Sequence, residues 1–395
     1  MREHFPIFEN QPNLIYLDSA ATAHKPHSVI NAIADFYRKD YATVHRAIYR
    51  PSLKATEKYH EAREAAGKFI NAEHPSEIIF TRGTTDSINL VAMSLSKSLL
   101  KPGDEIIVSK VEHHSNLVPW QMVAKETGAI LKHIDIDDAG NLLWKGVITE
   151  KTKIVSLAHV SNVTGTVNPI REIGRIAHEK GALLIIDGAQ AAPHMNVDVQ
   201  EIDADFYAFS GHKCYGPTGI GILYGKRKLL EKMPPVQGGG DMIADVGLEE
   251  STYGEPPLRF EAGTPIIASA IALKTALDFI EEIGRETIHL HEQMLLDRAK
   301  ERLSSIPQLR ILGTAYEKGP ILTFHIEGVH PLDLATFLDL KNIAIRSGHL
   351  CAKPAMRRFG IEQAARASFG IYNTIEEIDL FCDLVQDTVL QLVKA

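Results

Sequence analysis

Between residues 78 and 224 the chain alternates short apolar runs with longer segments in which apolar residues recur every three or four positions. Runs of this short length are typical of buried strands, and the longer segments are typical of helices that cover a sheet. The predicted strands are Ile78–Thr81, Glu105–Ser109, Ile154–Ala158, Leu183–Asp187, Asp205–Ser210 and Ile220–Tyr224. Helices are predicted over Thr84–Leu99 and over Pro169–Lys180, where proline begins the helix and Gly181 follows it. This order predicts an α/β fold with a large, doubly wound, mostly parallel sheet.

The pattern changes after Gly263-Thr264-Pro265. The later elements are predicted as helices over Ala268–Ile283, Glu286–Leu303 and Ile375–Val393, with strands around Ile321–Ile326 and Ala344–Arg346. We therefore expect a large domain over residues 15–266 and a smaller α+β domain over residues 267–395. We expect residues 1–14 to pack on the smaller domain.

The composition excludes several classes of protein. The chain has 395 residues, 45% of them hydrophobic, which is enough for two cores. Its net charge of −8 argues against a nucleic-acid groove. Residues 1–14 contain no apolar run, and the apolar runs elsewhere are too short to cross a bilayer, so we expect neither a signal peptide nor a membrane anchor. Three cysteines cannot form a disulfide framework in so long a chain, which favours a reducing cytoplasm.

A carboxylate and a lysine follow two of the predicted strands. Asp187 comes directly after the run Leu183–Ile186, at the sheet edge where ligands bind in doubly wound folds. A buried carboxylate needs a cation or strong donor, such as the protonated nitrogen of a pyridine ring. Capping of the next helix and metal ligation are equally open for Asp187 alone.

Lys213 leaves the strand Asp205–Ser210 through a Ser-Gly-His-Lys turn. Lysines are seldom held at such places unless they are paired or covalently engaged. The alternative of a surface loop lysine is weakened by the long apolar approach and by the turn Gly216-Pro-Thr-Gly219 behind it.

The segment Thr81-Arg-Gly-Thr-Thr85 lies between a strand and a helix N-terminus. Free backbone N–H groups, the helix dipole and two hydroxyls make an anion site there. With Asp187 and Lys213, this segment supplies what pyridoxal 5′-phosphate needs: a phosphate cup, a pyridinium partner and a lysine for covalent attachment.

At this point the chain resembles the class V aminotransferase group of fold type I pyridoxal-phosphate enzymes, and within it the SufS-type cysteine desulfurases. The resemblance covers nearly the whole chain. Its motifs are Tyr16-Leu-Asp18-Ser-Ala-Ala, Val44-His45-Arg46, Arg82-Gly-Thr-Thr85, Glu112-His113-His114-Ser-Asn-Leu-Val-Pro-Trp120, His159-Val-Ser-Asn162, Asp187-Gly-Ala-Gln190, Ser210-Gly-His-Lys213, Arg259-Phe-Glu-Ala-Gly-Thr264-Pro and Arg346-Ser-Gly-His-Leu-Cys351-Ala.

The resemblance implies a role for each matching residue. Lys213 forms the Schiff base to the cofactor, Asp187 meets the pyridine nitrogen, and His113 stacks on the ring and carries protons. Gln190 and Asn162 approach the ring hydroxyl. The phosphate is held by Thr84, Thr85, Ser210 and His212, and by Thr264 from the partner subunit, so the resemblance implies a homodimer. The substrate is bound by Arg366, Arg346, His45 and Asn162.

Cys351 is the cysteine expected to react. It lies in a loop with Gly348, whereas Cys382 lies in an apolar helix and Cys214 beside Lys213 suits turn packing. Nearby cations favour its thiolate. The resemblance implies that L-cysteine is converted to L-alanine: Lys213 takes the Cα proton, the Cys351 thiolate attacks the substrate sulfur, and the resulting persulfide passes to an acceptor protein for iron–sulfur cluster assembly.

Rival activities share the cofactor site. Selenocysteine lyase or cysteine sulfinate desulfinase chemistry would not need Cys351, and a transaminase would give this thiol no role. A non-enzymatic scaffold is disfavoured because Lys213, Asp187, His113, Cys351 and Arg366 are all present.

Three further features refine these expectations. Many relatives read Gly-His-His-Cys where this chain reads Gly-His349-Leu350-Cys351, and relatives that use a zinc-containing acceptor tend to carry His at the position of Leu332. Leu350 removes one polar group near the thiol, and Leu332 leads us to expect an acceptor of the SufE type rather than the SufU type. Adjacent residues of an extended Glu112-His113-His114 point to opposite faces, so we expect no metal there.

Overall fold

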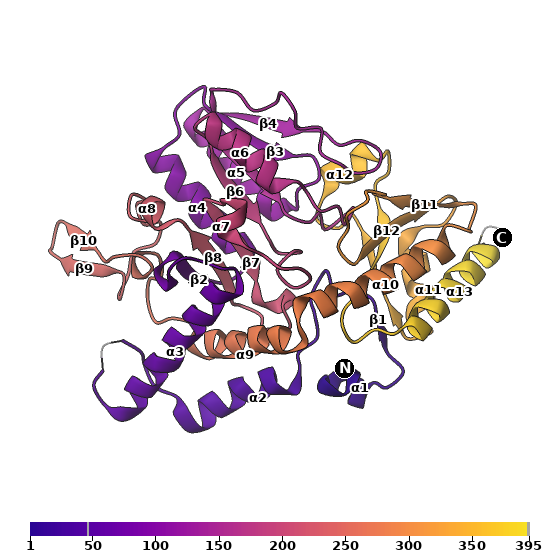
Figure 1. Ribbon diagram of the computed structural model, residues 1–395, viewed down its shortest axis with the longest axis horizontal. Helices are drawn as coiled ribbons and strands as arrows, with labels where there is room; N and C mark the ends of the chain where they lie inside the picture. Colours follow the sequence, from indigo (N-terminus) through magenta and orange to yellow (C-terminus); the bar gives the residue numbers. More distant parts are fainter. Residues whose placement is uncertain (46, 393–395) are drawn as a thin grey trace.

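The computed structural model describes residues 1–45 and 47–392 of the chain. Arg46, in the second motif above, and Val393, at the end of the last predicted helix, lie outside the described residues. The structure has a large sheet domain and a smaller sheet domain joined by a long helix, α10 (Arg285–Leu303) (Figure 1).

The large sheet has seven strands, ordered β2-β8-β7-β6-β5-β3-β4. Their bounds are β2 (Ile78–Thr81), β8 (Gly221–Gly225), β7 (Phe206–Ser210), β6 (Leu183–Asp187), β5 (Thr152–Ala158), β3 (Glu105–Ser109) and β4 (Ile130–Ile134). All pairings are parallel except those of β8, which runs against both of its neighbours. The predicted doubly wound, mostly parallel α/β fold is confirmed.

Helices cover both faces of this sheet because side chains of successive strand residues alternate between the faces. On one face lie α4 (Thr84–Ser98) and α5 (Val118–Thr127), and on the other α3 (Arg50–Phe69), α6 (Ile170–Glu179) and α9 (Ile267–Ile283). Strand β2 shows the alternation: Ile79 packs on the face covered by α4 and α5, and Ile78 and Phe80 pack on the face covered by α3, α6 and α9. Shorter elements are α1 (Pro6–Asn10), α2 (His27–Asp35), α7 (Val199–Ile202), α8 (Arg227–Leu230) and the hairpin β9 (Ile243–Val246) and β10 (Ser251–Tyr253).

The small domain contains an antiparallel sheet in the order β11-β12-β15-β14. Its strands are β11 (Leu309–Leu312), β12 (Ile321–Ile326), β15 (Ala364–Ser368) and β14 (Arg346–Gly348), and its helices are α10, α11 (Pro331–Asp339), α12 (Lys353–Arg358) and α13 (Ile375–Leu392). Where one strand was predicted around Ala344–Arg346, there are two. Strand β13 (Ile343–Ala344) pairs with β1 (Ile15–Tyr16), and β14 pairs with β15, so the chain changes partner at Ile345.

The division at residue 266 stays a prediction. Helix α9 packs against α2 and α3, whereas α10 packs against α13 and β12. These contacts favour a boundary at Gly284, between α9 and α10. The first residues contact both parts: Phe5 packs edge-on against Phe279 and Tyr372, and the Arg2 guanidinium pairs with Glu377 of α13. Of the helices in the described residues, none is both long and apolar enough to cross a membrane.

Candidate functional site

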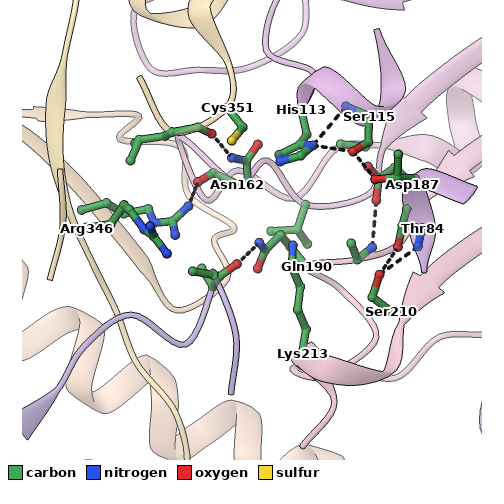
Figure 2. Close-up of a pocket in the computed structure, with 18 of the residues that line it drawn as sticks. Thr84, His113, Ser115, Asn162, Asp187, Gln190, Ser210, Lys213, Arg346 and Cys351 are labelled. Carbon is green, nitrogen blue, oxygen red and sulfur yellow. Dashed lines mark hydrogen bonds between the residues drawn. The ribbon is translucent and has the colours of Figure 1, made fainter. Parts of the chain in front are cut away.

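A cavity of about 440 Å³ lies at the carboxyl ends of β5, β6 and β7, where they face the small domain. It brings together most of the residues selected from the sequence. These are Thr84, Thr85, His113, Asn162, Asp187, Gln190, Ser210, His212, Lys213, Arg346, Cys351 and Arg366. In Figure 2, Cys351 and Arg346 lie on one side of the opening, Thr84, Ser210 and Asp187 lie on the other, and Lys213 extends between them.

Lys213 ends a tight turn, Gly211–Lys213, between β7 and β8. Only ten residues, 211–220, join these two strands, too few for a helical crossover, and this is why β8 runs antiparallel. Loss of contact with water lowers the pKa of Lys213 to about 8, although the nearby Asp187 opposes the shift. Within the described residues its amine makes no hydrogen bond or ion pair. Lys213 therefore lines the cavity with an amine of lowered pKa that is unpaired in the described part of the chain.

Asp187 ends β6 and is buried. Burial raises the pKa of its carboxyl group, and its hydrogen bond from the Ala189 N–H, 3.0 Å long, opposes the rise. In the described residues, the first helix after Asp187 is α7, which begins at Val199, so Asp187 does not cap a helix. A buried carboxylate with a single backbone donor is incompletely satisfied, and the protonated nitrogen of a pyridine ring would satisfy it.

A cluster of hydroxyls lies at the N-terminus of α4. The Ser210 Oγ accepts the N–H of Thr84 at 2.9 Å and lies 2.8 Å from the Thr84 Oγ1. Gly83 precedes the helix with φ of 151°, and a Cβ on Gly221 would lie 2.4 Å from the Cα of Gly83. Both positions therefore require glycine. Hydroxyls and free N–H groups at the positive end of a 15-residue helix suit a phosphate.

His113 and Gln190 complete this part of the cavity. The His113 Nδ1 accepts the N–H of Ser115 at 3.1 Å, which places the ring proton on Nε2. Burial, and then the charge of Lys213, lower the pKa of His113 to about 3, so the ring is neutral. The Gln190 Nε2 donates to the Ala20 carbonyl, while its Oε1 is buried without a partner in the described residues. His113 and Gln190, together with Asp187, Lys213 and the hydroxyl cluster, line a cavity that fits the predicted pyridoxal phosphate.

Cys351 is the exposed cysteine of the three, whereas Cys214 and Cys382 are buried. Burial raises the pKa of each of those two thiols to about 12. Leu350 and Cys351 both have left-handed backbones, with φ of 52° and 53°. The loop is fixed by its neighbours, because the Asn162 Nδ2 donates to the Leu350 carbonyl at 2.8 Å and the Leu350 side chain is buried in the hydrophobic cluster that the large domain shares with α12.

Two arginines meet at the small-domain side of the cavity. Arg346 and Arg366 lie directly opposite each other across β14 and β15. Arg366 is buried, and burial lowers its pKa. Its NH1 donates to the Asn162 carbonyl at 3.0 Å, while its buried Nε has no hydrogen-bond partner among the described residues. The guanidinium group of Arg366 lines the cavity, where its charge suits a substrate carboxylate.

The sequence interpretation missed the role of Asp18, which it named only as part of a motif. Asp18 is buried and bridges both arginines, with its Oδ2 2.8 Å from Arg346 and its Oδ1 3.2 Å from Arg366. The three groups carry a net charge of +1, which matches one carboxylate. The role of Asp18 could be recognised only from the tertiary structure, which brings residues 18, 346 and 366 together.

Two predicted residues lie outside this cavity. Thr264 lines a second cavity of about 310 Å³ together with Arg82 and Glu261. The ring of His45 packs edge-on against Tyr59, and its backbone has φ of 73°. Since the phosphate contact of Thr264 was assigned to the partner subunit, the roles of Thr264 and His45 stay predictions.

Comparisons with known proteins agree with this geometry. The aminotransferase class-V family matches residues 15–381. A probable cysteine desulfurase of Halalkalibacterium halodurans is 50% identical over 394 residues, covering 98% of this chain and 97% of that protein. One of Synechocystis is 48% identical over 98% of this chain and 95% of its own. Two solved structures are each 40% identical and cover 99% of this chain and 98% of theirs: the apo cysteine desulfurase of Thermococcus onnurineus, with a TM-score of 0.94, and the Escherichia coli cysteine desulfurase CsdA, with a TM-score of 0.92.

Proposed function

Because the chain belongs to the aminotransferase class-V family and is a pyridoxal-phosphate-dependent cysteine desulfurase, we propose that it works through a persulfide on Cys351. The products are L-alanine and a sulfur atom, which passes to an acceptor protein for iron–sulfur cluster assembly. The observation that supports this most directly is the exposed Cys351 thiol, which lines the same cavity as Lys213 and Arg366.

The cofactor would be held by Lys213, Asp187, Gln190 and the hydroxyls of Thr84, Thr85 and Ser210, with His212 beside them. When bound, pyridoxal phosphate supplies an electron sink for negative charge at the substrate Cα. Asp187 would keep the ring nitrogen protonated, because its buried carboxylate supplies the negative charge that favours the protonated form.

The substrate is oriented by its carboxylate on Arg366, which lines the cavity. The Lys213 amine, with its lowered pKa, takes the Cα proton. The Cys351 thiolate then attacks the substrate sulfur: a sulfur–sulfur bond forms, the carbon–sulfur bond breaks, and its electron pair stays with the organic fragment, which is protonated to alanine. The neutral His113, with its proton on Nε2, is placed to move a proton.

A single turnover without reductant tests the persulfide route. The native holoenzyme, given L-cysteine, is expected to release one alanine for each sulfur atom retained on the protein. Mass spectrometry is expected to find the added sulfur on the peptide that contains Cys351. Alanine released without any protein-bound sulfur would contradict the proposal.

The acceptor is proposed to be of the SufE type, since Leu332 stands where relatives with a zinc-containing acceptor tend to carry His. Leu332 is exposed on α11, where an acceptor can reach it. Sulfur transfer is expected to be faster to a SufE-type than to a SufU-type protein under equal concentrations, and the reverse order would overturn this choice. We also propose a cytoplasmic homodimer, to which Thr264 contributes across the interface. Sedimentation equilibrium checks the dimer.

Asp18 is proposed as a positioning residue for the substrate. Replacing it by Asn removes the charge that holds both guanidinium groups, so we expect KM for L-cysteine to rise about tenfold while kcat stays within about threefold. Steady-state kinetics measure both constants, and Asp297→Asn, at an exposed position on α10, is the matched control. An unchanged KM, or a loss confined to kcat, would show that Asp18 does not position the carboxylate.

The lowered pKa of Lys213 predicts a pH profile. Only the neutral amine accepts the Cα proton, and a pKa of about 8 means that the neutral fraction rises about tenfold per pH unit below pH 8 and levels off above it. Solvent-deuterium exchange at the Cα of L-alanine, followed by NMR in the Cys351→Ala variant, isolates this step from thiol titration. An inflection near the ordinary lysine pKa would contradict the structure.

A further inference from the structure

Two imidazole rings and the Cys351 thiol meet at the mouth of the cavity. One ligand atom each from His114, His349 and Cys351 lie within 4.8 Å of one another, and in the described residues this is the one such group of three. His349 and Cys351 line the cavity, whereas His114 approaches from the turn after His113. Spacing in the sequence gave no sign of this cluster, because His114 lies far from the other two along the chain.

Backbone hydrogen bonds tie these residues together. The His114 N–H donates to the Cys351 carbonyl at 2.8 Å, and the Cys351 N–H donates to the His349 Nδ1 at 3.1 Å. The Lys353 N–H donates to the His114 Nε2 at 3.2 Å. The two rings lie with centroids 5.5 Å apart and planes inclined by 35°. The cluster is therefore assembled by the fold itself.

Two imidazole nitrogens and one thiolate sulfur are a ligand set that zinc prefers. Zinc binds nitrogen at about 2.0 Å and sulfur at about 2.3 Å, and a site with three protein ligands leaves its fourth position to water. The exposed thiol provides an entry path. Tetrahedral binding brings ligand atoms closer than the present 4.8 Å limit, so the two half-buried rings and the Cys351 side chain would have to turn toward one another.

We propose that His114, His349 and Cys351 form a zinc site that holds the enzyme in an inactive state. On binding, the Cys351 thiol gives its proton to solvent and its sulfur donates an electron pair to the metal. That sulfur is then unable to attack the substrate, so bound zinc stops persulfide formation. This inference rests on Cys351 being the nucleophile of the proposed function.

The metal has to replace the two backbone N–H groups that now donate to the ring nitrogens. These hydrogen bonds, at 3.1 and 3.2 Å, are at the long end of the normal range. Their loss weakens the site relative to a structural zinc centre. We therefore expect binding that a chelator reverses, as an inhibitory site requires.

Cobalt reports on the ligands directly. Co²⁺ added to the reduced holoenzyme under anaerobic conditions is expected to give the visible bands of tetrahedral cobalt and a thiolate charge-transfer band, both abolished by Zn²⁺. His114→Asn and His349→Asn are expected to weaken binding at least tenfold, and Cys351→Ala to remove the charge-transfer band. His330→Asn is the matched control, because His330 is exposed and Asn keeps its capping role on α11. Native affinity in any of the three ligand variants overturns the three-ligand site.

Alkylation of Cys351 tests the same site in the unmodified protein. Stoichiometric Zn²⁺ is expected to slow the reaction of Cys351 with iodoacetamide at least tenfold, and EDTA is expected to restore it. An unchanged alkylation rate overturns the proposal even if a variant fails to fold. Neither the cobalt spectrum nor the alkylation rate depends on turnover. If zinc does not bind, the proposed persulfide route is unaffected. If the persulfide route is wrong, the single-turnover experiment shows it through the ratio of alanine to protein-bound sulfur.

Discussion

Replacing Lys213 with alanine is expected to lower kcat for L-cysteine by at least about 10⁴-fold. In the proposed mechanism the amine both attaches the cofactor and takes the Cα proton, and in the described residues no other amine lines the cavity. Alanine formation measures the loss, and the visible absorption of the protein reports cofactor attachment.

Lys228→Ala, at an exposed lysine on α8, is the matched control and should keep native activity. A small primary amine added to the Lys213→Ala protein is expected to restore part of the rate by supplying the missing base. Activity within tenfold of native without that amine would mean that another group removes the proton.

Replacing Cys351 with alanine is expected to lower sulfide production from L-cysteine by at least about 10³-fold. Turnover of cysteine sulfinate is expected to stay within about tenfold of native, because its leaving group departs without attack by a thiol. Assays of alanine formation from L-cysteine and from cysteine sulfinate, run in parallel on the native and variant proteins, measure this difference between the two substrates.

Cys382→Ala serves as control, since Cys382 is buried in the small-domain core and absent from the cavity lining. Should Cys351→Ala still release sulfide from L-cysteine at the native rate, the persulfide route is wrong. Should the native protein turn over selenocysteine or cysteine sulfinate far faster than cysteine, lyase chemistry is the better description.

The large domain was readable from the sequence because its strands are short apolar runs. Asp187 and Lys213 could be selected because each directly follows such a run, and parallel strands bring their carboxyl ends to one edge. Helices α2, α3 and α5 were not predicted, and two features of the sheet itself also escaped prediction. Strand β4 is an edge strand with mostly exposed or half-buried residues, so its pattern is weak. The reversed direction of β8 depends on the length of a connection rather than on hydrophobicity.

The small-domain side of the site was harder to predict. Strand β15 reads Ala-Ala-Arg-Ala-Ser, which has no β-branched or aromatic residue and hence no strand signal, yet it carries Arg366. Asp18 and His114 meet their partners only through tertiary contacts between distant segments. Motif resemblance identified the arginines and Cys351, but local pattern did not reveal what holds them in place.

The buried side chain of Leu350 has a consequence for how sulfur leaves the protein. Leu350 is buried in the hydrophobic cluster that the large domain shares with α12, and its carbonyl accepts from Asn162, so the loop that carries Cys351 is anchored to the rest of the protein. Releasing the loop would expose Leu350 to water and break that hydrogen bond. On the proposed persulfide route, the sulfur on Cys351 would therefore stay at the mouth of the cavity, and an acceptor would have to bring its own thiol there. We therefore expect sulfur transfer to depend on the approach of the acceptor rather than on movement of the Cys351 loop.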